Sequence, residues 1–141
     1  MLKYIRGPLV SCRLYSYMVG DQATLTKRIS AKDVNTFMKL SGDSNPIHSS
    51  VGDQNAVVHG AYLNSLVSCI IGTKLPGAGT LVVKQTLNFP NKCFVGDTVT
   101  VTVKVLEIRK IIKVAFNCTV EEDEKVVLYG DAHLIMEKHM G

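Results

Sequence analysis

A carboxylate and an imidazole lie five positions apart in the most polar stretch of the chain, Ser-Gly-Asp-Ser-Asn-Pro-Ile-His at residues 41–48. Asp43 and His48 are side chains that can accept and release protons, so a short irregular loop can point both into one cleft as an acid–base pair. Asn45 can hydrogen-bond to nearby backbone and Pro46 stiffens the path, which makes both of them loop-shaping residues. The same residues also fit an Asx turn at a helix end with His48 at the surface, and their spacing alone leaves both interpretations open.

A metal centre is the other chemistry that these residue types permit. A calcium loop is disfavoured, because Asp43 and Asn45 are followed by Pro and Ile where such a loop needs another oxygen ligand and a glycine. His59 could join Asp43, His48 and Asp53 as a ligand, but no two histidines have the spacing of a metal site. We therefore predict no metal site from these residues.

The cysteines give no sign of a metal site or of a disulfide framework, because they are scattered and include no CxxC pair. They are interpreted as small core or surface thiols in a reducing compartment. The four are Cys12, Cys69, Cys93 and Cys118.

The polar stretch lies between two predicted helices. The first spans about residues 31–40, since Ser30 and Asp33 form a capping-box-like start and Gly42 has the usual place of a helix-terminating glycine. The second runs from Val57 to about Lys74 and is apolar on nearly every side, which predicts a helix buried on all faces.

Strands are predicted for the remainder of the domain, because apolar and polar residues alternate there between turn signals. One buried helix and about five mostly antiparallel strands predict an α+β domain in which a curved sheet is rolled round the helix. The predicted strands are residues 23–29, 80–89, 98–108, 112–120 and 126–136.

Length and composition restrict the classes of protein that the chain can belong to. The 141 residues, 46% hydrophobic and 20% charged, suit one globular domain. The chain has no Trp and few other aromatic residues, which argues against binding single-stranded nucleic acid. The longest apolar segment, residues 57–71, falls short of the roughly 20 residues of a membrane span, so we expect no membrane span.

The first 20 residues differ in charge from the remainder. They carry Lys3, Arg6 and Arg13 with no Asp or Glu, which leaves 13 basic and 12 acidic side chains in the other residues. Basic, serine-containing and acid-free sequence of this kind is typical of a mitochondrial presequence, and the alternative is a flexible basic tail. We predict a presequence at residues 1–20, a single domain at 21–141, and a location in the mitochondrial matrix.

The polar stretch at residues 41–48 is followed by Val-Val-His-Gly-Ala-Tyr-Leu at residues 57–63. Together they resemble the signature of the MaoC-like, R-specific enoyl-thioester hydratase family. Within that family the chain is most similar to the mitochondrial hydroxyacyl-thioester dehydratases of type 2. The resemblance covers nearly everything from about Ser30 to Glu137. Its further matches, in order, are residues 65–68, 72–79, 88–90 and 95–97.

The resemblance implies a hotdog fold and a homodimer. It also implies a (3R)-3-hydroxyacyl-thioester dehydratase or R-specific trans-2-enoyl-thioester hydratase of type 2 fatty-acid synthesis that uses no metal or other cofactor. Asp43 and His48 match the catalytic dyad, and the substrate is an acyl thioester of coenzyme A or acyl carrier protein. Gly60 matches the residue whose backbone N–H holds the thioester oxygen, and Ser68 matches a serine that supports the aspartate. His59 is expected to orient the turn at Gly60.

One departure from the family keeps an alternative open. Only ten residues separate His48 from His59, so residues 49–56 are too short and too rich in Gly and Asn to form the small helix expected beside the acyl channel. A non-catalytic module that binds acyl thioesters or acyl carrier protein is therefore the alternative hypothesis. A hotdog thioesterase is disfavoured, because such enzymes lack the polar loop.

Overall fold

The computed structural model describes residues 16–49 and 56–137. Within them the chain forms, in order, β1 (Gln22–Arg28), α1 (Ala31–Ser41), the short 3-10 helix η1 (Pro46–His48), α2 (Gly60–Thr73), β2 (Thr80–Asn88), β3 (Thr98–Ile108), β4 (Ile112–Val120) and β5 (Val126–Met136). Residues 1–15 of the predicted presequence and 50–55 of the short segment lie outside the described residues.

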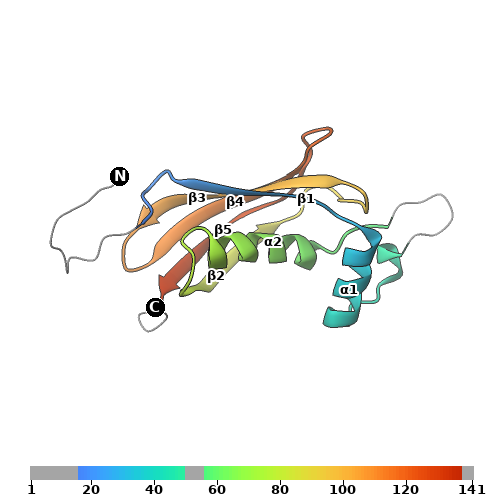
Figure 1. Cartoon of the computed structure of the whole chain (residues 1–141), viewed down its shortest axis with the longest axis horizontal. Coiled ribbons are helices and arrows are strands. Elements are labelled where there is room, and N and C mark those ends of the chain that lie inside the picture. Colours follow the sequence, from blue (N-terminus) through green and yellow to red (C-terminus); the bar gives the residue numbers. More distant parts are fainter. Residues whose placement is uncertain (1–15, 50–55, 138–141) are drawn as a thin grey trace.

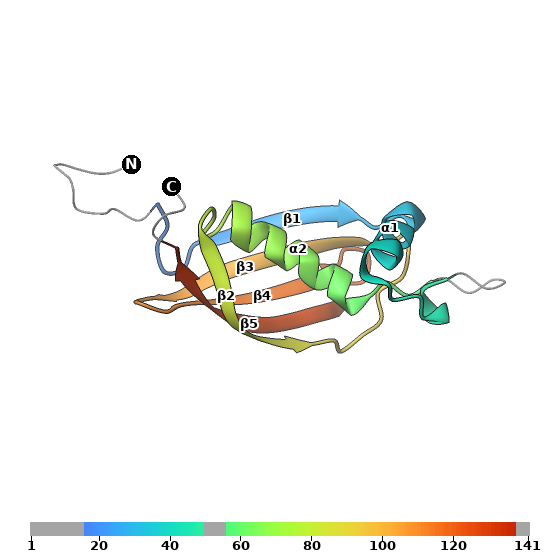
Figure 2. The ribbon, with the colours of Figure 1, turned by 90° about the horizontal axis from the view of Figure 1, so that it is seen from below.

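The five strands form one antiparallel sheet in the order β1-β3-β4-β5-β2. Figure 1 shows this sheet curving along α2, with α1 beyond one end of that helix. Figure 2 shows α2 lying lengthwise across one face of the sheet, with β2 and β1 on either side of it. The prediction of an α+β domain with a sheet rolled round a central helix is confirmed.

The core lies between α2 and the inner face of the sheet. Alternate residues of β3 point inward, as the period-2 pattern predicts, and Val99, Val101, Val103 and Val105 are fully buried. The helix contributes buried aliphatic side chains to the same cluster, namely Leu63, Leu66, Val67, Ile70 and Ile71. Burial of this apolar surface is the main force that holds α2 against the sheet.

Helix α1 begins and ends where the sequence indicates. Ser30 Oγ accepts a hydrogen bond from the N–H of Asp33, and the Asp33 carboxylate accepts one from the N–H of Ser30, both at 3.0 Å. That hydrogen bond from Ser30 is the main reason that the pKa of Asp33 lies below its usual value. Gly42 ends the helix in the left-handed conformation, with φ of +82°, which brings the chain directly into the polar loop.

Two expectations for the second helix are wrong. Helix α2 begins at Gly60, three residues after the predicted start, because Val57 forms a bridge with Phe94 and the N–H of Val58 donates to Cys93 O. It is also not buried on all faces. The sheet covers one side of α2 only, which leaves a stripe of small residues exposed: Ala61, Ser65, Ser68, Cys69 and Gly72.

Among the described residues, no helix combines the length and the apolar character needed to cross a membrane.

Two of the three described cysteines should be protected from alkylating reagents in the folded protein. Cys69 is exposed, whereas burial raises the pKa of Cys93 and of Cys118 to about 12. Iodoacetamide at pH 8 should therefore label Cys93 and Cys118 only after urea unfolds the protein, as measured by peptide mass spectrometry. Rapid labelling of either buried thiol in the folded protein would contradict this.

The same two thiols should make the fold sensitive to alkali. An unfolded thiol loses its proton near the ordinary value of 9.0, but the folded ones hold theirs up to about 12. Between these values the unfolded state binds fewer protons, so the free energy of unfolding should fall as the pH rises from 9 to 12. Below pH 9 both states hold these protons, so the two thiols should add no pH dependence to the free energy of unfolding.

Candidate active site

The polar loop is shaped by hydrogen bonds between its own side chains and backbone. The N–H of Asp43 donates to Ser41 Oγ (3.1 Å), and the N–H of Asn45 donates to Asp43 Oδ1 (3.2 Å). Asn45 Oδ1 accepts from the N–H of Ile47 (3.3 Å), and Pro46 occupies the first turn of η1. These contacts give Asn45 and Pro46 a structural place in the loop, and they turn the chain so that His48 faces inward.

Asp43 and His48 lie together at one edge of the fold. The distance from Asp43 Oδ2 to His48 Nε2 is 3.8 Å, with the His48 side chain 7% exposed and that of Asp43 51% exposed. His48 Nδ1 lies 2.6 Å from the carbonyl oxygen of Val57, which can only accept, so Nδ1 carries the proton and donates. In the neutral imidazole, Nε2 therefore has a lone pair available on the side of Asp43.

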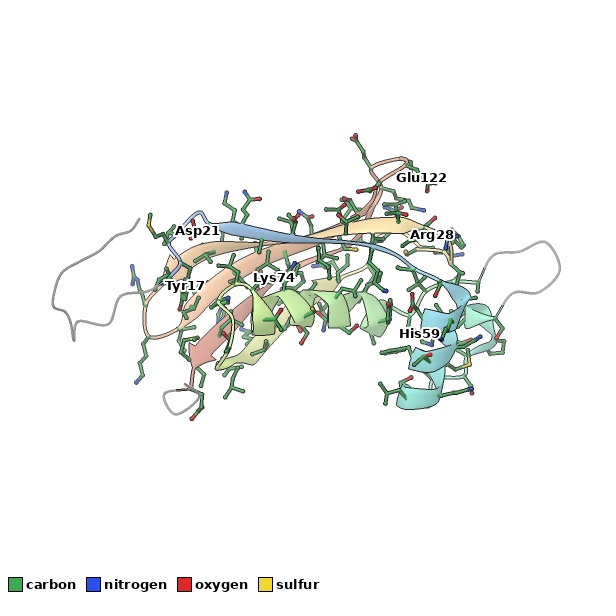
Figure 3. All side chains as sticks on the ribbon, in the orientation of Figure 1. Tyr17, Asp21, Arg28, His59, Lys74 and Glu122 are labelled. Carbon is green, nitrogen blue, oxygen red and sulfur yellow. The ribbon has the colours of Figure 1, made fainter. Side chains whose placement is uncertain are left out.

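His59 is the third polar side chain of this cluster. It is 2% exposed, its Nε2 lies 3.1 Å from the backbone oxygen of Asp43, and its ring stacks on that of His48 with centroids 3.5 Å apart. Figure 3 shows His59 at the end of α2 that faces α1, away from the end where Lys74 lies. The surface interpretation of His48 is wrong, because its ring is buried against that of His59.

Two aromatic residues that the sequence did not single out pack around this cluster. Phe37 of α1 makes edge-to-face contacts with the rings of His59 (4.9 Å) and Tyr62 (5.6 Å). Burial raises the pKa of Tyr62 to about 12. The helical period of α1 marks Phe37 as an inward residue, but no sequence signal indicates that it packs on a histidine.

Gly60 lies in the wall of a cavity of about 490 Å³. The cavity is mainly apolar and is lined by His48, Ile47, Leu63, Phe89 and Val127, among others. A Cβ on Gly60 would lie 2.8 Å from the Phe89 ring, so glycine lets the ring close on the helix end. As the first residue of α2, Gly60 also offers a backbone N–H that has no helical partner.

Ser68 is not brought to the dyad within one chain. It lies on the exposed stripe of α2, eight residues beyond Gly60, which is about 12 Å along a helix. Among the described residues, the structure shows no hydrogen-bond partner for the Ser68 hydroxyl.

The dyad and His59 are also close enough to be considered as metal ligands. One ligand atom from each of Asp43, His48 and His59 lies within 4.8 Å of the others. The two rings are nearly parallel, with 20° between their planes, so their lone pairs do not converge on one ion. His48 Nδ1 and His59 Nε2 are already bonded to carbonyl oxygens. The arrangement suits proton transfer better than metal binding.

Solved structures and curated proteins with the same architecture identify the class of protein. The fold matches an (R)-hydratase of Aeromonas caviae involved in PHA biosynthesis, with a TM-score of 0.79, 32% identity, and coverage of 87% of this chain and 99% of the other. A 3-hydroxybutyryl-CoA dehydratase of Methylorubrum extorquens is 39% identical over 123 residues, which are 81% of this chain and 77% of that protein. A mitochondrial 3-hydroxyacyl-[acyl-carrier-protein] dehydratase of Arabidopsis thaliana is 30% identical over 129 residues, with 84% and 76% covered. These likenesses define the fold as a hotdog fold and the protein as a hydro-lyase, as the sequence predicts.

The MaoC-like domain matches residues 19–126. The chain belongs to the MaoC-like family of R-specific enoyl-thioester hydratases and 3-hydroxyacyl-thioester dehydratases.

Proposed function

We propose that this enzyme interconverts trans-2-enoyl thioesters and (3R)-3-hydroxyacyl thioesters, with Asp43 and His48 as its catalytic residues. The observation that carries the proposal is the 3.8 Å separation of Asp43 Oδ2 and His48 Nε2 beside a mainly apolar cavity. An apolar cavity suits an acyl chain, and the two polar atoms provide the proton transfers.

The spacing of the two groups supports a mechanism through one shared water. Two atoms 3.8 Å apart can both hydrogen-bond to a single water at about 2.8 Å from each. In hydration the water's oxygen adds to C3 of the enoyl thioester as its proton passes to Asp43. The same proton then moves through the lone pair of His48 Nε2 to C2, which returns both side chains to their starting state. In dehydration the same groups remove the C2 proton and protonate the departing hydroxyl.

Gly60 supplies the remaining requirement, which is stabilisation of the negative charge that develops on the thioester oxygen. Its N–H, which has no partner among the described residues, lies at the start of α2 where the helix dipole is positive, and Gly60 lines the same cavity as His48. We propose that this N–H binds the thioester oxygen.

The test is an ultraviolet assay with crotonyl-CoA and a longer trans-2-enoyl-CoA. The proposal expects loss of the absorbance of the conjugated thioester and formation of the (3R)-alcohol. Saturable binding of both thioesters with no turnover would overturn it and would support the binding-module alternative instead. Release of free thiol would indicate a thioesterase.

We also propose a homodimer in which a second copy covers α2 and β2. Strand β2 is an edge strand of nine residues with exposed apolar side chains, including Leu81 (48%), Val83 (53%) and Leu87 (39%). An open apolar edge of this kind favours pairing with another chain. The exposed stripe of small residues on α2 lies beside it, since Asn64 of α2 and Gln85 of β2 exchange two hydrogen bonds. Small residues would let a partner helix approach closely.

Ser68 takes a role in this dimer that a single chain does not give it. If two α2 helices lie antiparallel about a two-fold axis, the C-terminal half of each lies beside the N-terminal half of the other. Ser68 is in the C-terminal half, so pairing moves it toward the Asp43 of the second copy. We propose that Ser68 supports the aspartate across the interface.

A mixed dimer should distinguish the two arrangements of Ser68. Ser68→Ala in both chains should lower kcat about tenfold through loss of one hydrogen bond to a charged group. A dimer with Asp43→Asn in one chain and Ser68→Ala in the other should keep about half of the wild-type activity, because one site retains both groups. Activity near one-twentieth of wild type would show that Ser68 acts within its own chain and would contradict the proposal.

A mitochondrial role in type 2 fatty-acid synthesis is proposed from the basic, acid-free residues 1–20 and from the mitochondrial relative in Arabidopsis. Residues 1–20 fused to a fluorescent reporter should direct it to mitochondria. Arg6→Gln together with Arg13→Gln should abolish import. A reporter that stays in the cytosol would refute the presequence.

A further inference from the structure

His59 and His48 tie two segments of the chain together by a reciprocal exchange. His48 in the polar loop donates from Nδ1 to the backbone oxygen of Val57, two residues before His59. His59 donates from Nε2 to the backbone oxygen of Asp43, five residues before His48. The N–H of Val57 completes the connection by donating to Ile47 O at 2.8 Å. Each imidazole therefore holds the backbone that precedes the other.

The stacking of the two rings also constrains the orientation of His48, one of the two catalytic residues. The His59 ring lies 3.5 Å from that of His48 and 20° from parallel, so it fixes the plane in which His48 Nε2 can point. On another side, Phe37 packs edge-to-face on His59 and so connects it to α1. His59 thus contacts both catalytic residues, one through its N–H and the other through its face.

The hydrogen bonds also define the state of His59. Its Nε2 faces a carbonyl oxygen and must carry a proton. Its Nδ1 is buried and has no partner among the described residues. With Nε2 bonded to Asp43 O and Nδ1 enclosed, His59 has no exposed ring nitrogen with which to exchange a proton with a substrate.

We propose that His59 is a positioning residue for both members of the dyad, holding the Asp43 backbone through its N–H and the His48 ring through its face. This goes beyond orienting the turn at Gly60, and it rests on the proposed function. A displacement of about 1 Å in a catalytic group can cost about 10²-fold in rate, so loss of both contacts should be visible in kcat.

Three substitutions separate the two contacts. His59→Gln keeps an N–H that can reach Asp43 O but removes the ring, whereas His59→Phe keeps the ring but removes the N–H. His59→Leu removes both. With a trans-2-enoyl-CoA substrate, His59→Leu should lower kcat about 100-fold while KM stays within threefold of wild type. The kcat of His59→Gln and that of His59→Phe should each be about tenfold higher than the kcat of His59→Leu. Melting temperature is measured for every variant.

The controls are the same substitutions at His133, a partly exposed residue of β5 away from the site, which should leave kcat within twofold. Any of three results would overturn the proposal. These are an equal loss of kcat in all three His59 variants, a loss of kcat that follows melting temperature alone, and a rise in KM without a fall in kcat. An active His59→Leu beside inactive Asp43→Asn would refute the role of His59 and leave the dyad standing. Full activity in Asp43→Asn would refute the dyad itself.

Discussion

Asp43→Asn is expected to lower kcat about 10³-fold while leaving the fold intact. The amide keeps the shape of the side chain but cannot take a proton from the water that we propose Asp43 shares with His48, whose Nε2 lies 3.8 Å from Asp43 Oδ2. The loop should survive, because the amide oxygen can still accept the hydrogen bond from the N–H of Asn45. His48→Ala should be impaired similarly, since it removes the second proton-transfer group and its hydrogen bond to Val57. Steady-state kinetics with a trans-2-enoyl-CoA measure both effects.

Asp131→Asn is the matched control, because this aspartate is exposed on β5 and outside the cavity. Its kcat should stay within twofold of wild type. Turnover retained in both Asp43→Asn and His48→Ala would remove the assigned dyad.

Gly130→Ala is expected to destabilise the fold by about 3 kcal/mol or more. A Cβ at this position of β5 would overlap the backbone oxygen of Thr86 and would lie 3.0 Å from the Phe116 ring. The obstacle is the backbone of the neighbouring strand rather than a mobile side-chain end, so β2 and β5 would have to separate. Thermal unfolding should show a loss of about 10 °C or more in Tm.

Asn117→Ala serves as the comparison, because Asn117 is exposed on the adjacent strand β4 and its truncation should cost no more than about 0.5 kcal/mol. A Gly130→Ala protein that melts within 2 °C of wild type would show that β5 accommodates a side chain where the structure leaves no room.

The secondary structure could be predicted closely because local signals are strong in this sequence. Three strands match their predicted bounds, since alternation in β3, β4 and β5 is bounded by clear turns. The start of α2 could not be predicted, because Val57 is drawn out of the helix by a bridge to Phe94, which is 37 positions later. The exposed stripe of α2 was missed for a related reason: an apolar pattern does not show whether the sheet or a second chain covers a face.

The site could be predicted in part. Asp43 and His48 share one short loop, so their spacing alone made their proximity plausible. Other contacts of the site depend on segments that meet only in the folded chain. They are the stacking of His48 on His59, the contact of Phe37 with His59, and the packing of Phe89 on Gly60. No spacing rule in the sequence encodes such contacts.

The central claim is that one water, shared by Asp43 and His48, adds its hydroxyl and a proton to the same face of the double bond. Hydration of crotonyl-CoA in D2O, with the configuration of C2 and C3 determined by NMR on the first product formed, tests it most directly. The account predicts the (3R)-alcohol with deuterium and hydroxyl added to the same face. A (3S) product, or addition to opposite faces, would contradict it.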